Sequence, residues 1–548
     1  MIRRLSWILV LGFASSLFAQ SEFPLPHPAP SADKPTRCDV LVAGGSFGGV
    51  AAAIGAAGLD VWVIEDTDWV GGQVTSQGVA PLDEHRFIEQ FGGTLFYDIF
   101  RKRVRDHYGH RNPGKGWVSR LCFEPRVGLK VMEDMLKEVR AKVLLESRVT
   151  AVARDGDRVT QVTVMLKDGT TRVFEPKFLL DATDLGDIYP LAGIPYRIGS
   201  DARSETGEPH ADTTANPKRT QSFTYCFAVD FVKGNKDLVK KPKDYERFRE
   251  TQPYTLTIGP EDKPQTYKIF SHAKGTGGPF WTYRSITPEI AMINWPGNDY
   301  RGTPILEADH QEAKDLAIGF LYWLQNECPR DDGGKGYPEM RLRKDVMGTE
   351  DGLSKRPYIR EGRRLKALTT IVEQDIVAGK TSKTGESVRG TLYPDTVGVG
   401  LYPVDIHVCY GDTKEHHGSG LPTKPFQIPL GSLIPENTRN VLAAGKAMGV
   451  THVTNGSYRL HPIEWNVGES AGRTAAYCIR KGRSPAEVRA DPDSMRALQQ
   501  AMLEAGTPLF WYVDLKRDTP EWVDAQLDAI RKGAAVDPAS LGLKSKVK

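Results

Sequence analysis

One short stretch of the sequence has the residue types and spacing to bind a diphosphate. Its small residues are Gly44, Gly45, Ser46, Gly48 and Gly49. They follow an apolar, strand-like run at 39–43 and precede a segment of helical composition at 50–57. Glycines let the chain turn tightly and bring backbone amides close to a phosphate, and a helix beginning there adds its positive end. Strand-to-helix turns that bind nothing can show the same pattern, and Ser46 stands where the usual fingerprint has its second glycine.

A second strand supports a dinucleotide-binding interpretation. The apolar run 61–64 is followed by Glu65, 21 residues after Gly44, where such folds place the carboxylate that holds a ribose diol. A further glycine pair, Gly71 and Gly72, precedes Gln73. NAD-binding domains have no regular need for this second pair, so the pattern favours FAD.

Candidate catalytic residues occur near the other end of the chain, in 458–464. Flavin chemistry needs a substrate C–H near N5 and a neighbouring base or charge. His461 can take a proton as hydride leaves, and Arg459 can hold an anion or stabilise negative charge on the reduced flavin. Purely structural roles for both side chains are the alternative.

His407 is a third catalytic candidate. It alternates with apolar residues, so it shares a strand face with Asp405, and a carboxylate beside an imidazole can orient it as a base. A His–Asp pair on the protein surface, without a catalytic role, would give the same sequence pattern. The dense charges at 360–364 allow two interpretations, an anchor for an acidic substrate or an ion-pair network. His416 and His417 lack convincing metal-ligand spacing, so no metal site is predicted.

The elements that must position these residues follow in order. We expect a helix opening at 124–126, strands at 141–145, 149–153 and 159–166, and a further parallel strand at 178–183. The pattern from 197 to 436 is loops, short strands and aromatic residues, interrupted by helices at 307–326 and 361–375. We expect a strand at 440–445 and a helix starting near 466, both lying beside the cofactor. Amphipathic helices follow.

Composition excludes several classes of protein. The 548 residues carry 72 Lys and Arg against 69 Asp and Glu, a net charge of +3, which argues against a general nucleic-acid binder. The six cysteines form no C-x-x-C pair, so no redox dithiol, zinc knuckle or c-type haem is visible. Two or three domains fit the length.

The first 20 residues read as a secretory leader, with a basic start, a short apolar core and small residues before a cut after Ala19. The apolar core is too short for a comfortable membrane span. The Arg3-Arg4 pair allows twin-arginine export as an alternative. A Pro-rich linker follows at 21–36. We therefore expect an exported protein, periplasmic or extracellular.

Taken together, the chain resembles the FAD-dependent oxidoreductases of the glutathione-reductase-like superfamily, specifically their bacterial, often exported group. The resemblance covers about 37–482, in seven ordered blocks: VAGGSFGGVAAAI, IEDTDWVGGQVTSQG, LLDATDLGDIYPLAG, RPYIREGRRL, VGLYPVDIH, FQIPLGSLIP and NVLAAGKAMGVTHVTNGSYRLHPIEWNVGESAG. The chain departs from the group at Ser46, in a short first helix, and at 184–186.

The resemblance implies a set of FAD contacts. They are the diphosphate at Gly44, Ser46 and Gly49; the adenosine ribose at Glu65; the ribityl and isoalloxazine side at Gly71, Gly72 and Gln73; adenine at the Val149 backbone; the turn beneath the diphosphate at Asp181 and Thr183; and closure over the flavin by Gly445 and Gly468.

We therefore predict an α/β protein with a Rossmann-like FAD-binding domain, containing a parallel sheet and a β-meander, plus an inserted α+β substrate domain. The predicted segments are a signal peptide at 1–20, a linker at 21–36, the FAD-binding domain at 37–196 and 437–482, the substrate domain at 197–436, and a helical extension at 483–548. The predicted activity is oxidation of an alcohol, sugar or amine by hydride transfer to flavin N5, with electrons passing to oxygen or an external acceptor. The alternatives are a flavin reductase or double-bond enzyme, and a noncatalytic surface or carbohydrate-associated protein on a flavoprotein scaffold.

Overall fold

The computed structural model describes residues 34–259, 263–385, 389–414, 416–511 and 519–532. The predicted leader and nearly all of the predicted linker lie outside these residues, as do two segments of the predicted helical extension. The described residues from Pro35 onward form one compact unit.

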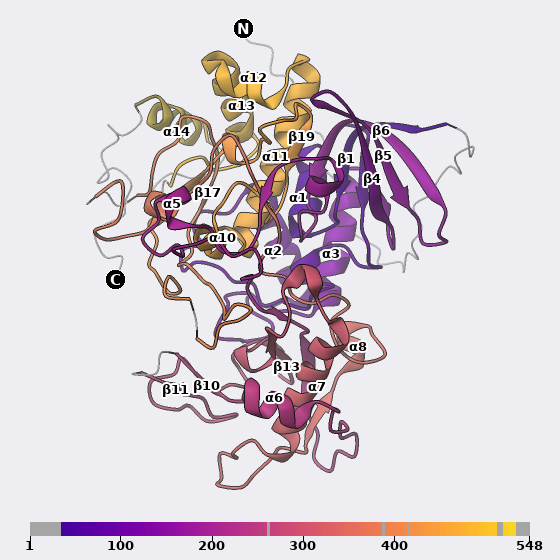
Figure 1. Cartoon of the computed structure of the whole chain (residues 1–548), viewed down its shortest axis with the longest axis vertical. Helices are drawn as coiled ribbons and strands as arrows, with labels where there is room; N and C mark the ends of the chain where they lie inside the picture. The colour runs from indigo at the N-terminus through magenta and orange to yellow at the C-terminus, as the bar shows by residue number, and fades with distance from the viewer. Residues whose placement is uncertain (1–33, 260–262, 386–388, 415, 512–518, 533–548) are drawn as a thin grey trace. The chain divides into compact units, whose positions relative to one another are not determined.

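A seven-stranded sheet is the framework of this unit (Figure 1). Its strands are β1 (Thr36–Ala43), β2 (Val61–Ile64), β3 (Lys142–Leu144), β4 (Arg148–Asp155), β5 (Arg158–Met165), β6 (Thr171–Asp181) and β19 (Val441–Ala443). The order is β3-β2-β1-β6-β5-β4, and β19 also pairs with β6. β3, β2, β1, β6 and β19 run parallel, whereas β4 and β5 form an antiparallel meander with β6. The parallel strands are apolar and mostly buried because helices cover the sheet.

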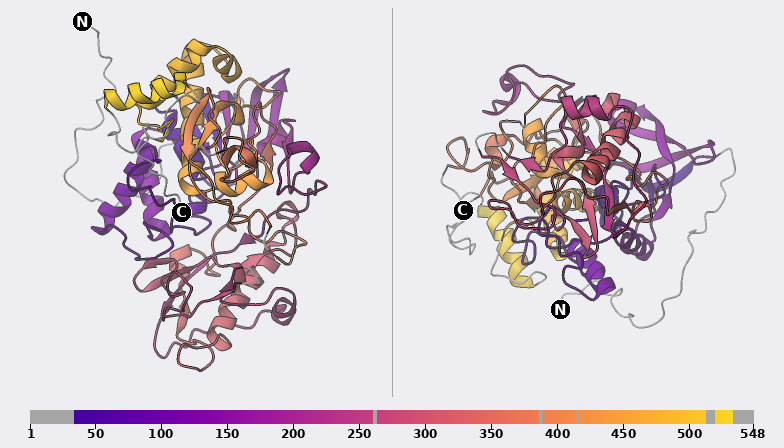
Figure 2. Two further views of the ribbon diagram at one scale, coloured as in Figure 1. Left: turned by 90° about the vertical axis from the view of Figure 1, so that its left-hand side faces the viewer. Right: turned by 90° about the horizontal axis from the view of Figure 1, so that it is seen from below.

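The first and the last parts of this framework meet through two helices. α1 (Phe47–Gly55) packs against α11 (His461–Lys481), and glycines allow the close approach. A Cβ on Gly468 would lie 1.9 Å from the carbonyl oxygen of Gly48, and one on Gly472 would lie 2.0 Å from that of Ala52. Both views of Figure 2 show the orange C-terminal elements beside the indigo N-terminal ones. α2 (Leu95–Tyr108) and α3 (Pro125–Glu138) complete this core.

A second, antiparallel sheet lies in the segment between β6 and β19. Its order is β12 (Ser285–Thr287), β13 (Ile290–Ile293), β9 (Phe227–Phe231) and β15 (Met340–Leu342). α6 (Tyr245–Thr251) and α7 (His310–Asn326) pack with it around a core rich in aromatic side chains, which include Trp295 and Tyr300.

Short elements connect these parts. The strand pairs are β8 (Phe223–Thr224) with β14 (Asp299–Tyr300), β7 (Tyr196–Arg197) with β16 (Arg364–Leu365), β10 (Thr257–Ile258) with β11 (Gln265–Thr266), and β17 (Thr396–Gly400) with β18 (Phe426–Pro429). The remaining helices are α4 (Ile188–Leu191), α5 (Arg203–Thr206), α8 (Lys344–Met347), α9 (Glu373–Ile376), α10 (His452–Tyr458), α12 (Pro485–Ala490), α13 (Pro492–Glu504) and α14 (Pro520–Lys532).

The predicted fold class is confirmed: a mixed α/β protein with a parallel-dominated sheet, a meander, additional sheets and a helical C-terminal part. The domain boundaries stay a prediction. β17 and β18 belong to the predicted substrate segment, yet their residues Val397 and Ile428 are buried in the core of the seven-stranded sheet. Ser470 of α11 donates to the carbonyl oxygen of Val397 at 2.6 Å.

Two helix predictions are wrong. The basic helix expected at 361–375 is reduced to α9, because Glu361 and Arg364 are buried and pair with each other. Arg364 also bonds Asp201 of a distant segment at 3.0 Å. α11 begins at His461 rather than near 466, and Pro462 in its first turn is the start signal.

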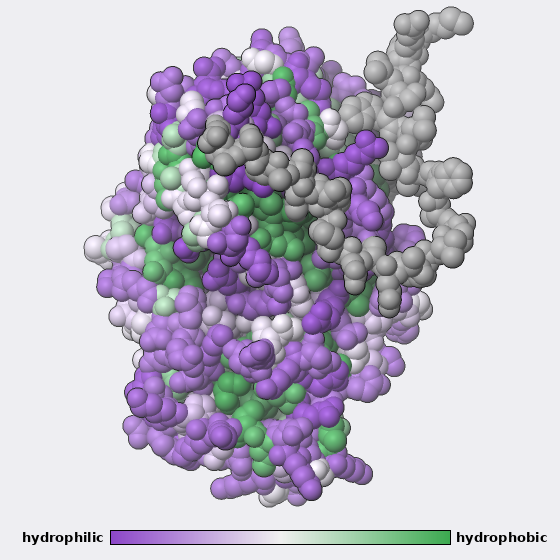
Figure 3. Space-filling view, turned by 90° about the vertical axis from the view of Figure 1, so that its right-hand side faces the viewer, coloured by the Kyte–Doolittle hydropathy of each residue, from purple (hydrophilic) through white to green (hydrophobic). Residues whose placement is uncertain are grey.

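Apolar and hydrophilic residues are interspersed on the face drawn in Figure 3. Among the described residues, the exposed large apolar side chains are Leu238, Phe270, Leu306 and Leu368. Within the same part of the chain, no helix combines the length and apolar character needed to cross a membrane.

Candidate functional site

A cleft of about 480 Å³ opens at the carboxyl ends of β1, β2 and β6. Ligands of open parallel sheets bind at this edge, outside the strand ends. Five of the predicted cofactor residues line the cleft. They are Gly44, Ser46, Glu65, Val149 and Thr183.

The N-terminus of α1 can receive an anion in this cleft. The Ser46 side chain caps the helix by accepting from the Gly49 amide at 3.1 Å. Among the described residues, no group accepts from the amides of Ser46 and Phe47. Two unpaired amides at a helix start provide a diphosphate site.

The remaining glycines of the turn let it pack closely against neighbouring backbone. Gly44 has a φ of +93°, and a Cβ there would lie 2.5 Å from the carbonyl oxygen of Ala182. A Cβ on Gly49 would lie 2.0 Å from the Gly44 carbonyl oxygen, and one on Gly48 would lie 2.4 Å from that of Ala444. Gly45 donates its amide to Glu65 at 2.9 Å. The turn therefore fits between β6 and β19 only because these side chains are missing.

The acidic residues of the cleft are held in place. Glu65 accepts from the Thr67 amide at 2.9 Å as well as from Gly45, and burial raises the pKa of Glu65 well above its usual range. Asp181 lies fully buried beneath the turn, where it accepts from the Thr183 amide at 3.0 Å. Burial raises the pKa of Asp181 to about 7.

The second glycine pair forms a turn beside α1. The Gly71 amide donates to the Gly45 carbonyl oxygen at 2.6 Å, and a Cβ on Gly72 would lie 2.9 Å from Ser46 Cα. The next residue, Gln73, is fully buried and donates to Glu464 of α11. Among the described residues, its Oε1 has no hydrogen-bond partner. Its neighbour Gly72 packs against Ser46 of the cleft lining, so the unpaired acceptor lies close to the cleft, on the side that the resemblance assigns to the flavin ring.

The two C-terminal glycines have different surroundings. Gly445 has space, since a Cβ there would lie 3.6 Å from Ala182 Cα and 3.7 Å from a Glu464 carboxylate oxygen. Gly468 contacts Gly48 of α1, and its predicted role of closing over the flavin stays a prediction. Its missing side chain permits the crossing of two helices.

Sequence reasoning missed a buried charge pair beside the cleft. Lys446 lies 2.5 Å from Asp184 and donates to the Ile359 carbonyl oxygen at 2.7 Å. Burial raises the pKa of Glu464 to about 6, against the opposing charge of Lys446. The sequence did offer one indication of this pair, because the charged Lys446 directly follows Gly445 in an otherwise apolar segment.

The outer wall of the cleft was also missed. It comes from the region of the second core and comprises Ile305, His310, Arg356, Pro357 and Ile359. Arg356 forms an ion pair with Asp66, and Lys355 pairs with Asp68 at 3.0 Å. The segment 355–359 is therefore tied across the cleft to the loop that follows β2. No local pattern marks these residues, because they act through a long-range contact.

The geometry of His461 opposes its predicted role as a base. Its Nδ1 accepts from the Asp83 amide at 2.9 Å, and its Nε2 lies 3.1 Å from the Val79 carbonyl oxygen, to which it donates. Burial lowers the pKa of His461 to about 4. With both ring nitrogens bonded to backbone, the side chain positions the segment 79–83.

Arg459 is buried and holds a charge cluster together. It donates to the Tyr358 hydroxyl at 2.8 Å and to Asp405 at 2.7 Å. Its own carbonyl oxygen accepts from Gln73 at 3.4 Å. Arg459 therefore links the residue beside the cleft to the segment that carries His407.

His407 lies between two carboxylates. Its Nδ1 is 2.5 Å from Asp299, and its Nε2 is 3.6 Å from Asp405. Burial and the charge of Arg360 lower the pKa of His407, but the two carboxylates outweigh them and raise it above its usual value. The pair that the sequence placed on one strand face belongs to a loop and is half-buried, with 22% of the His407 and 36% of the Asp405 side-chain surface accessible. Asp299 was not foreseen.

The charged residues at 360–364 form ion pairs within the protein. Of the two interpretations given above, the structure favours the ion-pair network over an anchor for an acidic substrate. Arg360 pairs with Asp299 at 3.0 Å, and Glu361 also bonds the His452 ring at 2.9 Å. Among the described residues, no group of three or more His, Cys, Asp or Glu side chains has the arrangement of a metal site.

Comparison with known proteins decides the family. The family profile described as FAD dependent oxidoreductase matches residues 39–502. The chain belongs to this family. FAD is therefore the cofactor of this oxidoreductase, and the predicted identity as a flavoenzyme is confirmed at the family level. No curated protein matches the sequence.

Solved structures similar to this oxidoreductase are distant. One is a geranylgeranyl bacteriochlorophyll reductase-like protein from Thermoplasma acidophilum, with 11% identity, a TM-score of 0.34, and coverage of 93% of this chain and 90% of that one. Another is the anhydrotetracycline hydroxylase OxyS from Streptomyces rimosus, with 12% identity, a TM-score of 0.34, and coverage of 90% and 73%. At these values they carry no argument about substrate or mechanism.

The residues of the cleft fit FAD. The unpaired amides of Ser46 and Phe47 match a diphosphate, and the Glu65 carboxylate in the cleft wall matches a ribose diol. The unpaired Gln73 Oε1 supplies a polar atom on the side predicted for the ring.

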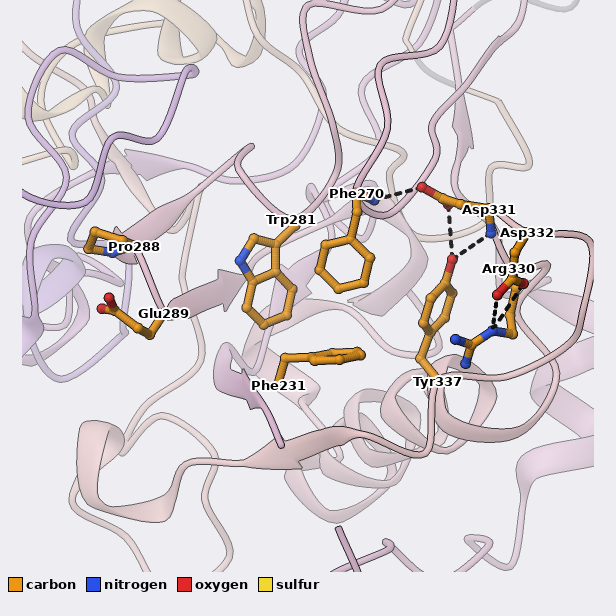
Figure 4. Close-up of a pocket in the computed structure, with 9 residues that line it drawn as sticks. All are labelled: Phe231, Phe270, Trp281, Pro288, Glu289, Arg330, Asp331, Asp332 and Tyr337. Carbon is orange, nitrogen blue, oxygen red and sulfur yellow. Dashed lines mark hydrogen bonds and ion pairs between the residues drawn. The ribbon is translucent and has the colours of Figure 1, made fainter. Parts of the chain in front are cut away.

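A second cavity, of about 440 Å³, lies in the antiparallel region and shares no lining residue with the cleft (Figure 4). Phe231, Phe270 and Trp281 pack against one another there, with ring centroids 5.0–6.3 Å apart. Asp331 accepts from the Ile269 amide at 2.9 Å and from the Tyr337 hydroxyl at 2.9 Å. The polar groups drawn are thus largely engaged in holding loops, and Trp281 lies here rather than beside the cofactor cleft.

Proposed function

We propose that this oxidoreductase oxidises a small organic substrate, an alcohol, sugar or amine, by hydride transfer to flavin N5, with electrons passing to oxygen or an external acceptor. The observation that carries the proposal is the position of His407. A half-buried, carboxylate-flanked imidazole is joined through Asp405 and Arg459 to Gln73. An imidazole in this position can exchange the substrate proton while the cofactor takes the hydride.

FAD and the protein have separate roles in the proposed reaction. Bound FAD supplies the two-electron oxidant, which accepts the hydride from the substrate carbon. Asp299 holds Nδ1 of His407 and thereby directs Nε2 toward Asp405. The 3.6 Å between Nε2 and Asp405 is too long for a strong hydrogen bond, so Nε2 remains available to a substrate hydroxyl or amine. His407 acts as the base when it is neutral.

Arg459 has two functions in this proposal. It fixes Asp405 and Tyr358 around the reacting region, and its buried positive charge favours negative charge that develops nearby. The charge of Lys446 lies on the cleft side of Tyr358, 6.0 Å from the ring centre. These cations are the residues of this chain best placed to stabilise a reduced cofactor.

The decisive experiment is anaerobic mixing of the purified FAD-loaded protein with a panel of alcohols, sugars and amines. Rapid loss of the oxidised flavin absorption with one class supports the proposal, and the His407→Gln variant is then expected to lose that reaction while retaining FAD. A protein that holds stoichiometric FAD and is bleached by no member of the panel contradicts the proposal.

We also propose that the protein is exported. The support is the leader-like composition of the first 20 residues, with the predicted cut after Ala19. N-terminal sequencing of protein recovered from periplasm and medium tests this. Recovery of the uncut chain in the cytoplasm alone would contradict it.

A further inference from the structure

The second cavity, of about 440 Å³, is formed by several separate parts of the antiparallel region (Figure 4). Phe231 is the last residue of β9, Phe270 and Trp281 lie between β11 and β12, and Arg330 and Tyr337 follow α7. The cavity shares no lining residue with the cofactor cleft. A ligand held here would therefore be recognised independently of FAD.

Four aromatic side chains form one continuous surface in this cavity. The rings of Phe231, Phe270 and Trp281 have centroids 5.0–6.3 Å apart, and the Tyr337 ring lies 5.8 Å from that of Phe270. Phe270 keeps 42% of its surface exposed, so a ligand can reach its ring. The faces of aromatic rings carry negative charge density and attract cations.

One cation of the chain already uses this aromatic surface. The guanidinium carbon of Arg330 lies 4.6 Å from the centre of the Tyr337 ring. The same guanidinium pairs with Asp332 and with Glu339, both at 3.2 Å. Among the described residues, no lysine or arginine lies over the other three rings of the cavity.

The lining of the cavity is negatively charged. It includes three carboxylates, those of Glu289, Asp331 and Asp332, and one guanidinium. Asp331 is held in place by the backbone amides of residues 269–271, from which it accepts at 2.8–3.0 Å. Glu289 accepts from the Thr287 hydroxyl at 3.2 Å, and among the described residues neither it nor Asp331 forms an ion pair. An anionic ligand would be repelled here, whereas a cation would be attracted.

Trp281 adds a hydrogen-bond donor to this surface. Only 8% of the residue is exposed, and among the described residues its indole N–H has no hydrogen-bond partner. The nitrogen is nevertheless not fully enclosed, and Figure 4 shows it on the side of Pro288 and Glu289. A donor without a partner in a largely buried side chain costs free energy, which an acceptor atom of a ligand would recover.

We infer that this cavity binds a small organic cation, whose methylated ammonium lies against the aromatic rings beside Glu289 and whose oxygen accepts from the Trp281 indole. Methyl groups pack on aromatic rings and spread the positive charge, so such an ammonium needs no close ring of hydrogen-bond acceptors. A metal ion does not fit, because among the described residues no group of three or more His, Cys, Asp or Glu side chains has a metal-site arrangement. The inference goes beyond the proposed function and does not depend on it.

The test compares two molecules of the same shape and different charge. Choline and its neutral isostere 3,3-dimethylbutan-1-ol are each titrated into the FAD-loaded protein, and binding is measured by isothermal titration calorimetry. Methyl glucoside is titrated in the same way, because aromatic cavities also bind sugars. Choline is expected to bind at least about tenfold more tightly than either neutral molecule, and its affinity is expected to fall as salt concentration rises.

Two variants separate the sources of this affinity. Phe270→Leu keeps an apolar side chain but removes the ring, so it is expected to weaken choline binding by about threefold to tenfold with little change for the isostere. Glu289→Gln removes a negative charge and is expected to weaken choline binding by about threefold. Both side chains are exposed, so the fold should be preserved. Glu307→Gln is the matched control, since Glu307 is an exposed carboxylate that does not line the cavity.

Equal affinities for choline and its isostere would overturn the inference, because the charge would then contribute nothing. Tighter binding of methyl glucoside would overturn it in favour of a sugar site, and an absence of choline binding at millimolar concentrations would overturn it outright. Unchanged choline affinity in both variants would show that the cation binds elsewhere on the protein. None of these measurements depends on flavin bleaching, so the proposed oxidation stands or fails separately.

Discussion

The diphosphate end of the cofactor cleft and the charge cluster around His407 are built differently. The diphosphate end depends on backbone groups of one glycine turn, whose missing side chains let Ala182 and Ala444 approach. The charge cluster comprises His407, Asp299, Arg360, Asp405 and Arg459, side chains from separate segments that ion pairs hold together. The diphosphate site is thus local in the sequence, whereas the charge cluster exists only in the assembled tertiary structure.

This difference predicts different effects of substitution in the two regions. A side chain added to the glycine turn collides with backbone, which cannot move away cheaply. A side chain changed in the charge cluster alters hydrogen bonds and charge while the turn keeps its shape. Variants in the two regions should therefore separate cofactor affinity from catalytic rate.

The largest effect is expected in the charge cluster, at His407. His407→Gln removes the proposed base, and general base catalysis typically contributes at least about 100-fold, or about 2.7 kcal/mol in activation free energy. The rate of flavin reduction, measured by stopped flow, should fall by that amount while FAD content is unchanged.

His461→Gln is the matched histidine control for this prediction. His461 bonds only backbone groups, so its loss should lower the thermal midpoint while flavin reduction keeps its pH dependence. If the two variants exchanged these behaviours, the assignment of the base would be reversed.

The next largest effect distinguishes the two C-terminal glycines. Gly468→Ala places a Cβ 1.9 Å from the Gly48 carbonyl oxygen and should destabilise the FAD-free protein by about 2–3 kcal/mol, because α1 and α11 must separate. Gly445→Ala has 3.6 Å of space and should leave the FAD-free stability unchanged while weakening FAD binding. Chemical denaturation and FAD titration measure the two quantities, and equal losses of stability would contradict the contrast.

A smaller effect is expected at the wall of the cleft. Arg356→Gln should weaken FAD binding by about tenfold, because it removes a cation from the cleft and its ion pair with Asp66. Fluorescence titration of the FAD-free protein measures this. Arg249→Gln is the matched arginine control, since neither Arg249 nor its ion-pair partner Glu327 lines the cleft. Equal FAD affinity in both variants would show that the wall does not contact the cofactor.

The smallest effects are pH dependences with opposite signs. The pKa of His407 is raised above its usual value of about 6.5, so the neutral base forms as pH rises through that raised pKa, and flavin reduction should accelerate. The same group stabilises the fold fully below pH 6.5, and this contribution is lost as pH rises through the raised pKa.

The pKa of His461 is lowered to about 4, so its contribution to stability is present above about pH 6.5 and is lost as pH falls toward 4. The difference in unfolding free energy between wild type and His461→Gln should therefore shrink over that interval. A difference that is constant from pH 7 to 4 would contradict the assignment.

The features that could be predicted from the sequence are the local ones, and the features that could not depend on long-range contacts. Strand β2, the residue Glu65 and the glycine turn were predictable, because complete burial of a short strand and tight backbone geometry both restrict residue types locally. The helix expected at 361–375 failed because Glu361 and Arg364 are buried in long-range ion pairs that helical periodicity cannot express. Asp299 and Arg356 could not be found, since their roles depend on contacts with residues more than 100 positions away.

The addition of β19 to β6, and of α11 to α1, has a consequence for biosynthesis. A ribosome translating this chain releases the glycine turn early, but the strand and helix that cover it are about 400 residues further on. At typical elongation rates of about 5–20 residues per second, the nascent turn would wait at least about 20 seconds for its partners. Chaperones would therefore meet a chain whose apolar β6 edge and α1 surface are still uncovered. A premature stop codon would release a chain in the same state.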